Sequence, residues 1–199
     1  MMKVIGITGG IGSGKSTVSD IIKKHKYPLI DCDEISHELT QKDETVLKEI
    51  RECFGDDIFD ANGMLIRQDL ANIIFSDKSK KKILEDIVIT RIFEIVEDDL
   101  SKHRSAGTNI VFIDAPLLIE TGLNRLCDVC VLVTADTETR LDRVEKRDGI
   151  SRNRILERIN NQIPESEKEL LADDIIDNSG SIEELNTKVE RLINKYVEY

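Results

Sequence analysis

A glycine-rich segment near the start of the chain has the residue types and spacing of a phosphate-binding loop. The run Gly9-Gly10-Ile11-Gly12-Ser13-Gly14-Lys15-Ser16 fits the pattern G-x-x-x-x-G-K-[ST], between a short apolar segment and a stretch with helical spacing. Glycines let the backbone wrap a phosphate so that its N–H groups point inward, and the positive end of the following helix attracts the anion. We therefore expect Lys15, on an exposed loop, to contact the β- and γ-phosphates of a nucleotide, and the Ser16 hydroxyl to coordinate Mg²⁺.

Two carboxylates follow the second short apolar segment. Leu29-Ile30 leads into Asp31-Cys32-Asp33, and the carboxyl ends of parallel strands are where open α/β sheets bind ligands. A carboxylate there can accept the proton of an attacking hydroxyl, which makes Asp33 a candidate general base. The alternative is that Asp33 caps the helix that follows it. We interpret Asp31 as a supporting or capping group.

A third acidic residue ends the apolar run Val111-Phe112-Ile113-Asp114. This run resembles a Walker B strand, but Ala115 stands where motor ATPases have a glutamate. The sequence has no guanine-specific N-K-x-D motif, and Asp60–Gly63 matches D-x-x-G only formally, in a predicted turn. These observations argue against a GTPase or a motor ATPase.

Arginines are concentrated in the segment 140–158, which carries seven basic and four acidic side chains in a chain of net charge -11. Arg143 and Arg147 are one helical turn apart on one predicted helix face, where their planar guanidinium groups could clamp a phosphate that is being transferred. The alternative is a solvated helix on which these arginines pair with Asp142, Glu145 or Asp148. Spacing alone does not decide between the two.

Composition excludes several classes of protein. The 28 basic residues are outnumbered by 39 acidic ones, so binding to a nucleic-acid backbone is not expected. No apolar run approaches the roughly 18 residues of a membrane span, and we expect neither a span nor a signal peptide. Four irregularly spaced cysteines favour a cytoplasmic protein without disulfides. Cys127 and Cys130 form a C-x-x-C, but in a predicted strand they would face opposite sides and share no metal.

Apolar runs and helical periodicity alternate along the chain. Strands are predicted at 3–8, 29–31, 110–114 and 129–134, with a weak fifth centred on Ile175-Ile176. A helix is predicted from Thr17 to Lys26, and helix starts with capping boxes at Ser166 and Ser181. This alternation predicts a three-layer α/β fold with a parallel sheet. The helical interval from about Asp33 to Ser101 is longer than one crossover needs, which indicates an inserted helical region for substrate.

Taken together, these motifs resemble those of the dephospho-CoA kinase family of small-molecule kinases, nearly from end to end. The resemblance rests on residues 7–18, 30–33 and 116–120 and on scattered positions that we list here: Phe54, Gly55, Asn62, Gly63, Arg67, Arg143, Arg147, Asp148, Arg158, Gln162 and 172–178. The phosphate loop alone is common to many families, whereas this combination is specific.

The resemblance implies transfer of the ATP γ-phosphate to the ribose 3′-hydroxyl of dephospho-CoA, with Mg²⁺. It implies a five-stranded P-loop kinase fold with a nucleotide core at 1–32, 108–139 and 174–199, a helical substrate region at 33–107 and a lid at 140–173. It makes Asp33 the base and places Asn178 by the adenine. The expected catalytic residues are Asp33, Lys15 and Arg147. The acceptor site is expected to be bordered by Asp33, Pro116, Leu117 and Leu118. The expected ATP-binding residues are Ile11, Gly12, Ser13, Gly14, Lys15, Ser16, Thr17, Arg143, Arg147 and Asn178.

The chain departs from the family pattern at two places. Cys32 replaces a customary alanine, and Ile89-Thr90 stands where the family commonly has His-Pro. Two other function classes remain open at this point. One is a different small-molecule or nucleoside monophosphate kinase, and the other is a non-catalytic nucleotide switch.

Overall fold

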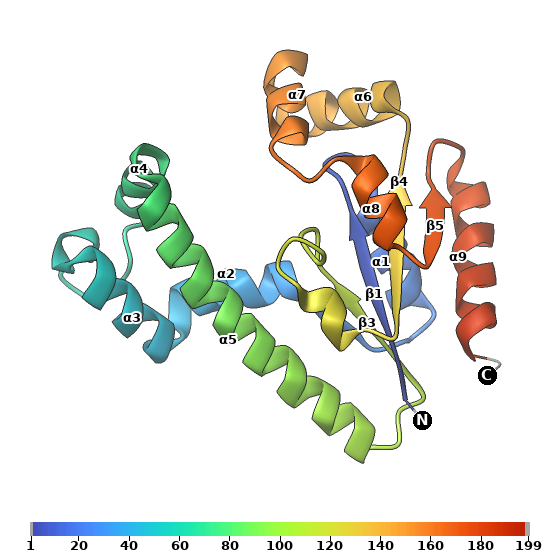
Figure 1. Cartoon of the computed structure of the whole chain (residues 1–199), viewed down its shortest axis with the longest axis horizontal. Coiled ribbons are helices and arrows are strands. Elements are labelled where there is room, and N and C mark those ends of the chain that lie inside the picture. Colours follow the sequence, from blue (N-terminus) through green and yellow to red (C-terminus); the bar gives the residue numbers. More distant parts are fainter. Residues whose placement is uncertain (1, 198–199) are drawn as a thin grey trace. The chain divides into compact units, whose positions relative to one another are not determined.

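The computed structural model describes residues 2–197. These residues form two compact units, of which the first contains the chain up to Asp31 and from Leu100 onward, and the second contains Cys32–Asp99. Figure 1 shows the order of the elements along the chain.

A parallel sheet is the centre of the first unit. Within residues 2–197 it has five strands: β1 (Lys3–Gly9), β2 (Leu29–Asp31), β3 (Ile110–Asp114), β4 (Val129–Thr134) and β5 (Asp174–Asp177). Their order across the sheet is β2-β3-β1-β4-β5, and every neighbouring pair is parallel. The residues of β3 and β4 are all buried, because both faces of the sheet are covered, and this explains their continuous apolar sequences. The predicted α/β fold with a parallel sheet is confirmed.

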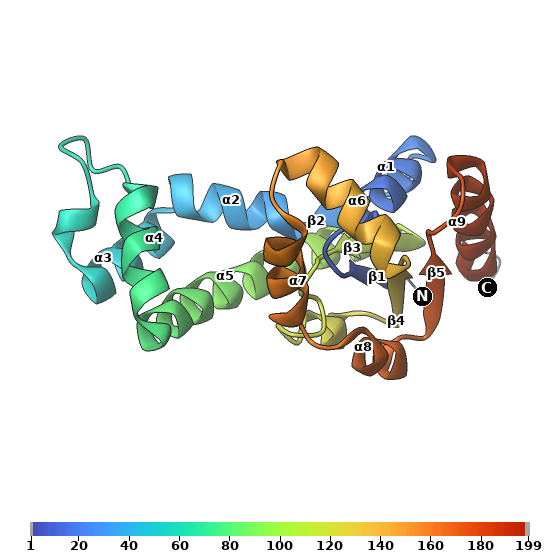
Figure 2. The ribbon, with the colours of Figure 1, turned by 90° about the horizontal axis from the view of Figure 1, so that it is seen from above.

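Helices α1 (Lys15–Lys24) and α9 (Ile182–Val197) pack their apolar faces against the sheet. Their buried side chains Val18, Ile22, Leu185 and Val189 join one core cluster with residues of the strands. In Figure 2, α1 and α8 (Glu165–Leu171) lie on opposite faces of the sheet, which gives the first unit its layers. Helix α1 ends at Lys24, two residues before the predicted end, since the backbone at Lys26 is left-handed, with φ 62°.

Helices α6 (Thr137–Asp148) and α7 (Arg152–Asn160) lie beyond the carboxyl ends of the strands (Figures 1 and 2). Asp136 caps α6 by accepting a hydrogen bond from the Thr139 N–H over 2.9 Å. Leu141, Val144 and Ile155 form a small apolar cluster that holds the two helices together. The arginine-rich segment is therefore a packed helical pair.

The two predicted capping boxes have different outcomes. Ser181 caps α9, because its Oγ accepts a hydrogen bond from the Glu184 N–H over 3.2 Å. The prediction at Ser166 is wrong: α8 begins at Glu165, directly after Pro164, so Ser166 already lies inside the helix. Pro164 fixes its own φ and needs no N–H partner, which makes the helix start there without a serine cap.

The second unit is helical, as the sequence predicts for this interval. It contains α2 (Cys32–Lys42), α3 (Glu44–Phe54), the short 3₁₀ helix η1 (Asp56–Ile58), α4 (Arg67–Ser76) and most of α5 (Lys78–Ser105). Asp60 lies in a turn between Phe59 and Leu65, where its Oδ1 accepts hydrogen bonds from the N–H groups of Asn62 and Met64. Its role is that of a turn residue, as predicted. Among the described residues, no helix is long and apolar enough to cross a membrane.

Candidate functional site

The glycine-rich loop connects the end of β1 to the start of α1. The backbone at Gly12 and Gly14 is left-handed, with φ of 80° and 86°, a conformation that glycine adopts without strain. A Cβ at Gly12 would lie 2.7 Å from the carbonyl oxygen of Arg140, and one at Gly14 would overlap the side-chain amide of Asn178. Both glycines are therefore required by conformation and by close packing.

Asn178 and Arg143 support the loop by hydrogen bonds to its backbone. The Asn178 amide donates to the Ser13 carbonyl over 2.8 Å, while Arg143 donates to the same carbonyl over 3.4 Å and to the Asn178 carbonyl over 2.9 Å. Asn178 is 5% exposed, so its side chain is committed to the loop backbone. The structure thus brings three of the predicted residues together and gives Arg143 a contact with the loop rather than a surface ion pair.

Ile11 is held through both of its main-chain groups. Its N–H donates to Gln162 Oε1 over 3.2 Å, and its carbonyl accepts from Arg140 Nε over 2.9 Å. Arg140 also donates to Glu165 over 2.6 Å, and it is only 6% exposed. Burial raises the pKa of Glu165, and the positive charge of Arg140 opposes that shift. Sequence analysis missed these supports, since an arginine in a charged segment gives no sign that it is buried.

Lys15 lies beside a buried carboxylate. Its ammonium forms an ion pair with Asp114 at the end of β3, and Ser19 Oγ donates to the other oxygen of Asp114 over 2.6 Å. The side chains of Lys15 and Asp114 are 13% and 5% exposed. The expectation that Lys15 lies on an exposed loop is therefore wrong, because Lys15 is the first residue of α1 and faces Asp114. Ser16 is exposed in the same turn and Thr17 is half-buried.

The acidic residues after β2 are placed by that strand. Asp31 pairs in register with Asp114 across β2 and β3, and its carboxylate lies 3.6 Å from Lys23 Nζ. Helix α2 begins at Cys32 without an intervening loop, so Asp33 lies in its first turn, where the side chain is exposed. Asp33 belongs to the second unit. Along the chain, it comes two residues after the carboxyl end of β2.

The residues predicted at the acceptor site form a turn segment, Pro116–Gly122, between β3 and the 3₁₀ helix η2 (Leu123–Leu126). Thr8 Oγ1 donates to the Pro116 carbonyl over 3.1 Å. Leu118 is fully buried against Gly6, whereas Leu117 is 43% exposed. Leu118 therefore anchors this segment, and Leu117 exposes its apolar side chain.

Arg147 is the exposed arginine of the predicted pair on α6. Its Nε donates to Asp148 Oδ1 over 2.7 Å and its Nη2 to Oδ2 over 3.1 Å, and Arg158 lies 3.5 Å from the same carboxylate. The hydrogen bond from Arg147 lowers the pKa of Asp148. With a side chain that is 66% exposed, Arg147 is free to change partners.

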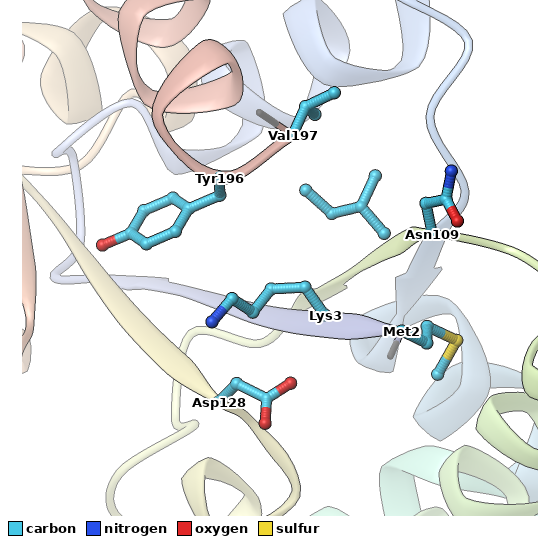
Figure 3. A pocket seen from close by; sticks show the side chains of 7 residues that line it. Met2, Lys3, Asn109, Asp128, Tyr196 and Val197 are labelled. Carbon is cyan, nitrogen blue, oxygen red and sulfur yellow. The ribbon is translucent and has the colours of Figure 1, made fainter. Parts of the chain in front are cut away.

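A pocket of about 380 Å³ lies at the amino ends of the strands, lined among others by Lys3, Asn109, Asp128 and Tyr196 (Figure 3). None of the predicted site residues lines it. Parallel α/β sheets bind ligands at the carboxyl ends of their strands, so this pocket does not compete with the loop as the candidate site.

The C-x-x-C pair does not behave as a site. Cys127 follows η2 and lies outside β4, so the expectation that both cysteines lie in one strand is wrong. Cys130 is buried, and burial raises the pKa of its thiol to about 11. Neither cysteine forms a disulfide, and no three metal-ligating side chains of residues 2–197 gather as a metal site.

Comparison with known proteins gives the family. Residues 3–184 match the sequence model of the dephospho-CoA kinase family. A dephospho-CoA kinase of Clostridium tetani is 41% identical over 189 residues, covering 94% of this chain and 83% of that protein. One of Lactobacillus johnsonii is 33% identical over 195 residues, covering 98% of each chain.

Solved structures agree with this result. A Thermus thermophilus protein superposes with a TM-score of 0.82 at 34% identity, covering 98% of this chain and 97% of that one. The Campylobacter jejuni dephospho-CoA kinase gives 0.76 at 25% identity, covering 100% of this chain and 98% of that one. A shikimate kinase of Aquifex aeolicus, with a TM-score of 0.52 at 21% identity over 96% of this chain and 97% of that one, shares the P-loop kinase fold alone. This chain belongs to the dephospho-CoA kinase family.

Proposed function

We propose that this protein transfers the γ-phosphoryl group of ATP to the ribose 3′-hydroxyl of dephospho-CoA, giving coenzyme A and ADP. The observation that carries the proposal is the glycine loop with Lys15 beside Asp114, in a chain that matches dephospho-CoA kinases over residues 3–184. We also propose the cytoplasm as its compartment, since a few irregularly spaced cysteines are typical of proteins in a reducing environment. A non-catalytic switch is disfavoured because the family is one of kinases.

Phosphate binding is assigned to the loop and to two cations. The N–H groups of Ile11, Ser13 and Thr17 donate within the chain, so other backbone N–H groups of the loop and the dipole of α1 face the β- and γ-phosphates. Lys15 exchanges part of its attraction to Asp114 for the phosphate oxygens. Arg147, which is exposed and paired with the neighbouring Asp148, turns toward the γ-phosphate as it leaves ATP. Arg143 and Asn178 keep the loop in its phosphate-binding shape through Ser13.

The chemical step needs a base for a hydroxyl acceptor. The ribose 3′-oxygen forms a bond to the γ-phosphorus as the bond from that phosphorus to the β–γ bridging oxygen breaks, and ADP leaves. Asp33 accepts the proton of the hydroxyl. A positioned carboxylate contributes roughly 10²–10⁴-fold to such a step. A nucleoside monophosphate kinase, whose acceptor is already ionised, gains nothing from this base.

Magnesium fits the oxygen ligands that the chain offers. The exposed hydroxyl of Ser16 and the buried carboxylate of Asp114 are hard donors close to Lys15, and Mg²⁺ prefers such oxygens together with substrate phosphates. Ser16 and Asp114 would hold the ion. When bound, it neutralises charge on the β- and γ-phosphates.

The acceptor is assigned to the turn segment Pro116–Gly122 on one side. Leu117 exposes an apolar side chain there, and Leu118 fixes the segment to the core. An apolar contact of this kind suits the base or the pantetheine arm of dephospho-CoA, whereas the phosphates require the cations described above.

A coupled assay tests the proposal directly. Purified protein is supplied with ATP and Mg²⁺, and ADP formation is followed with dephospho-CoA, shikimate, and a panel of nucleosides and nucleoside monophosphates. We expect ADP formation with dephospho-CoA to exceed that with every other acceptor, and the product to carry the new phosphate on the 3′-oxygen. Preferred use of a monophosphate or of shikimate would replace the proposal with the corresponding kinase.

A further inference from the structure

Helix α8 buries a charged side chain and exposes apolar ones, which is the reverse of what its sequence favours. Lys168 is the buried residue of this helix and is 2% exposed, whereas Leu170 and Leu171 are 86% and 54% exposed. A helix positioned by the hydrophobic effect would turn its leucines inward and its lysine to water. Something other than apolar burial therefore sets the rotation of α8.

The partner of Lys168 is a carboxylate of the turn segment Pro116–Gly122. Lys168 Nζ lies 2.6 Å from Glu120 Oε1, and the Glu120 side chain is 17% exposed. Within the described residues, Nζ and both oxygens of Glu120 make no hydrogen bond of good geometry. Charge attraction is thus what joins the two segments, and removing either charge would leave the other buried alone.

The same helix is tied to the phosphate loop at its other end. Glu165 accepts a hydrogen bond from Arg140, and Arg140 in turn donates to the Ile11 carbonyl. Helix α8 therefore carries two ionic contacts, one toward the phosphate loop and one toward the segment that carries Leu117. The segment itself has turns rather than regular helix or strand, so its conformation depends on such anchors.

We propose that Glu120 and Lys168 are positioning residues for the acceptor: their ion pair fixes the turn segment Pro116–Gly122 so that Leu117 meets dephospho-CoA. This inference rests on the proposed function. A buried ion pair adds little net stability compared with apolar side chains of similar size, but it specifies which groups come together. The exposed leucines of α8 are the cost of that specificity.

The test replaces the pair by apolar side chains. In the double variant Glu120→Leu/Lys168→Met, no buried charge is left without a partner, and we expect a melting temperature close to that of the wild type. We expect the KM for dephospho-CoA to rise about tenfold, while the KM for ATP stays within about twofold, because the supports of the phosphate loop are unchanged.

Two further variants complete the experiment. Lys195→Met removes a 2.7 Å ion pair with Asp174 that is 52% exposed on the lysine side, and as a matched control it should leave both KM values unchanged. Glu120→Gln keeps the size of the side chain and removes its charge. It should show the same selective rise in the KM for dephospho-CoA, and it decides the question if the double variant does not fold.

Unchanged KM values in a folded double variant would overturn the inference, since the pair would then be structural only. An equal rise in both KM values would overturn it as well, because that result indicates general loosening. Calorimetric binding of dephospho-CoA to wild type and variants gives the same comparison without turnover. A wild type that binds dephospho-CoA but does not phosphorylate it would therefore count against the proposed function and leave this comparison intact.

Discussion

The side-chain amide of Asn178 donates to the main-chain carbonyl of Ser13 over 2.8 Å, across 165 residues of sequence. This contact ties the segment after β5 to the phosphate loop, and it excludes any side chain at Gly14. The family resemblance places Asn178 by the adenine of ATP. In the structure, its amide nitrogen supports the loop backbone, so one residue can link the position of the base to the shape of the phosphate site.

Replacing Asn178 should therefore affect ATP more than the acceptor. We expect Asn178→Ala to raise the KM for ATP several-fold, because the Ser13 carbonyl loses its nearer side-chain donor, with little change in the KM for dephospho-CoA. Steady-state kinetics with each substrate varied separately measures this. Ser179→Ala, one residue further on, is the matched control. Equal changes in the two KM values would show that Asn178 acts through general stability.

Lys15→Met should lower both the rate of phosphoryl transfer and the stability of the fold. We expect kcat to fall by roughly 10²–10³-fold, the loss seen when one preorganised charge is removed from a transition state. The variant also leaves Asp114 buried without its cation, though Ser19 still donates to it. The melting temperature should therefore fall, by about 2–4 °C for each kcal/mol lost in a chain of this size. Thermal unfolding without ligand measures the second effect, and an unchanged kcat would refute the phosphate role of Lys15.

Asp33→Asn keeps the shape of the side chain and removes the proton acceptor. We expect kcat to fall by roughly 10²–10⁴-fold while the affinity for ATP, measured by calorimetry, is retained. Glu34→Gln makes the same chemical change at the next residue of the same helical turn, which is also exposed. It should turn over normally. If Asp33→Asn behaved like Glu34→Gln, Asp33 would be a helix-start residue without a part in the reaction.

Arg147→Ala should lower kcat more than it weakens ATP binding, because the proposed contact forms as the γ-phosphate is transferred. Lys146→Ala, which removes the neighbouring exposed charge, is the control. Hydrogen exchange across residues 140–165 should slow when an ATP analogue and dephospho-CoA are bound together, since a closing lid opens less often. If hydrogen exchange in this segment were the same with and without both ligands, and Arg147→Ala turned over normally, the segment would be a solvated helix that does not act as a lid.

The Cys130 thiol gives a pH dependence with a definite sign. Burial raises its pKa to about 11 from an ordinary value of 9.0. A group whose pKa is raised by folding stabilises the protein fully below its unfolded pKa and loses that contribution as the pH rises through the folded value. Wild-type stability should thus fall more steeply than that of Cys130→Ala between pH 9 and about 11. Urea unfolding at a series of pH values measures the difference, and parallel curves would contradict it.

The sequence predicted the sheet well because its strands are continuous apolar runs. The bounds predicted for β2, β3 and β4 agree with the structure, since each apolar run ends at a polar side chain. The glycine loop was equally clear, because its conformation leaves few residue types possible. Family membership followed from the combination of motifs.

Buried cations were the part that sequence reasoning could not predict. Arg140 and Lys168 lie in charged stretches of the sequence and Lys15 lies in the glycine-rich loop, and each pairs with a carboxylate far along the chain. Hydrophobic periodicity contains no information about such partners, and at α8 it points the wrong way. The start of α8 was missed for a related reason, because a proline there replaces the serine cap that the pattern favours.

The first and last elements of the chain, β1 and α9, meet at the amino ends of the strands, on the side of the sheet opposite to the phosphate loop. Lys3 Nζ lies 6.0 Å from the centre of the Tyr196 ring, beside the pocket of Figure 3. Met2 and Val197 both line this pocket, so a short peptide linker can join them in a circularly permuted variant, with new termini opened in the turn at Asp60–Gly63. Such a rearranged chain keeps β1, the glycine loop and α1 in one continuous stretch, although β3, β4 and β5 are then synthesised before them.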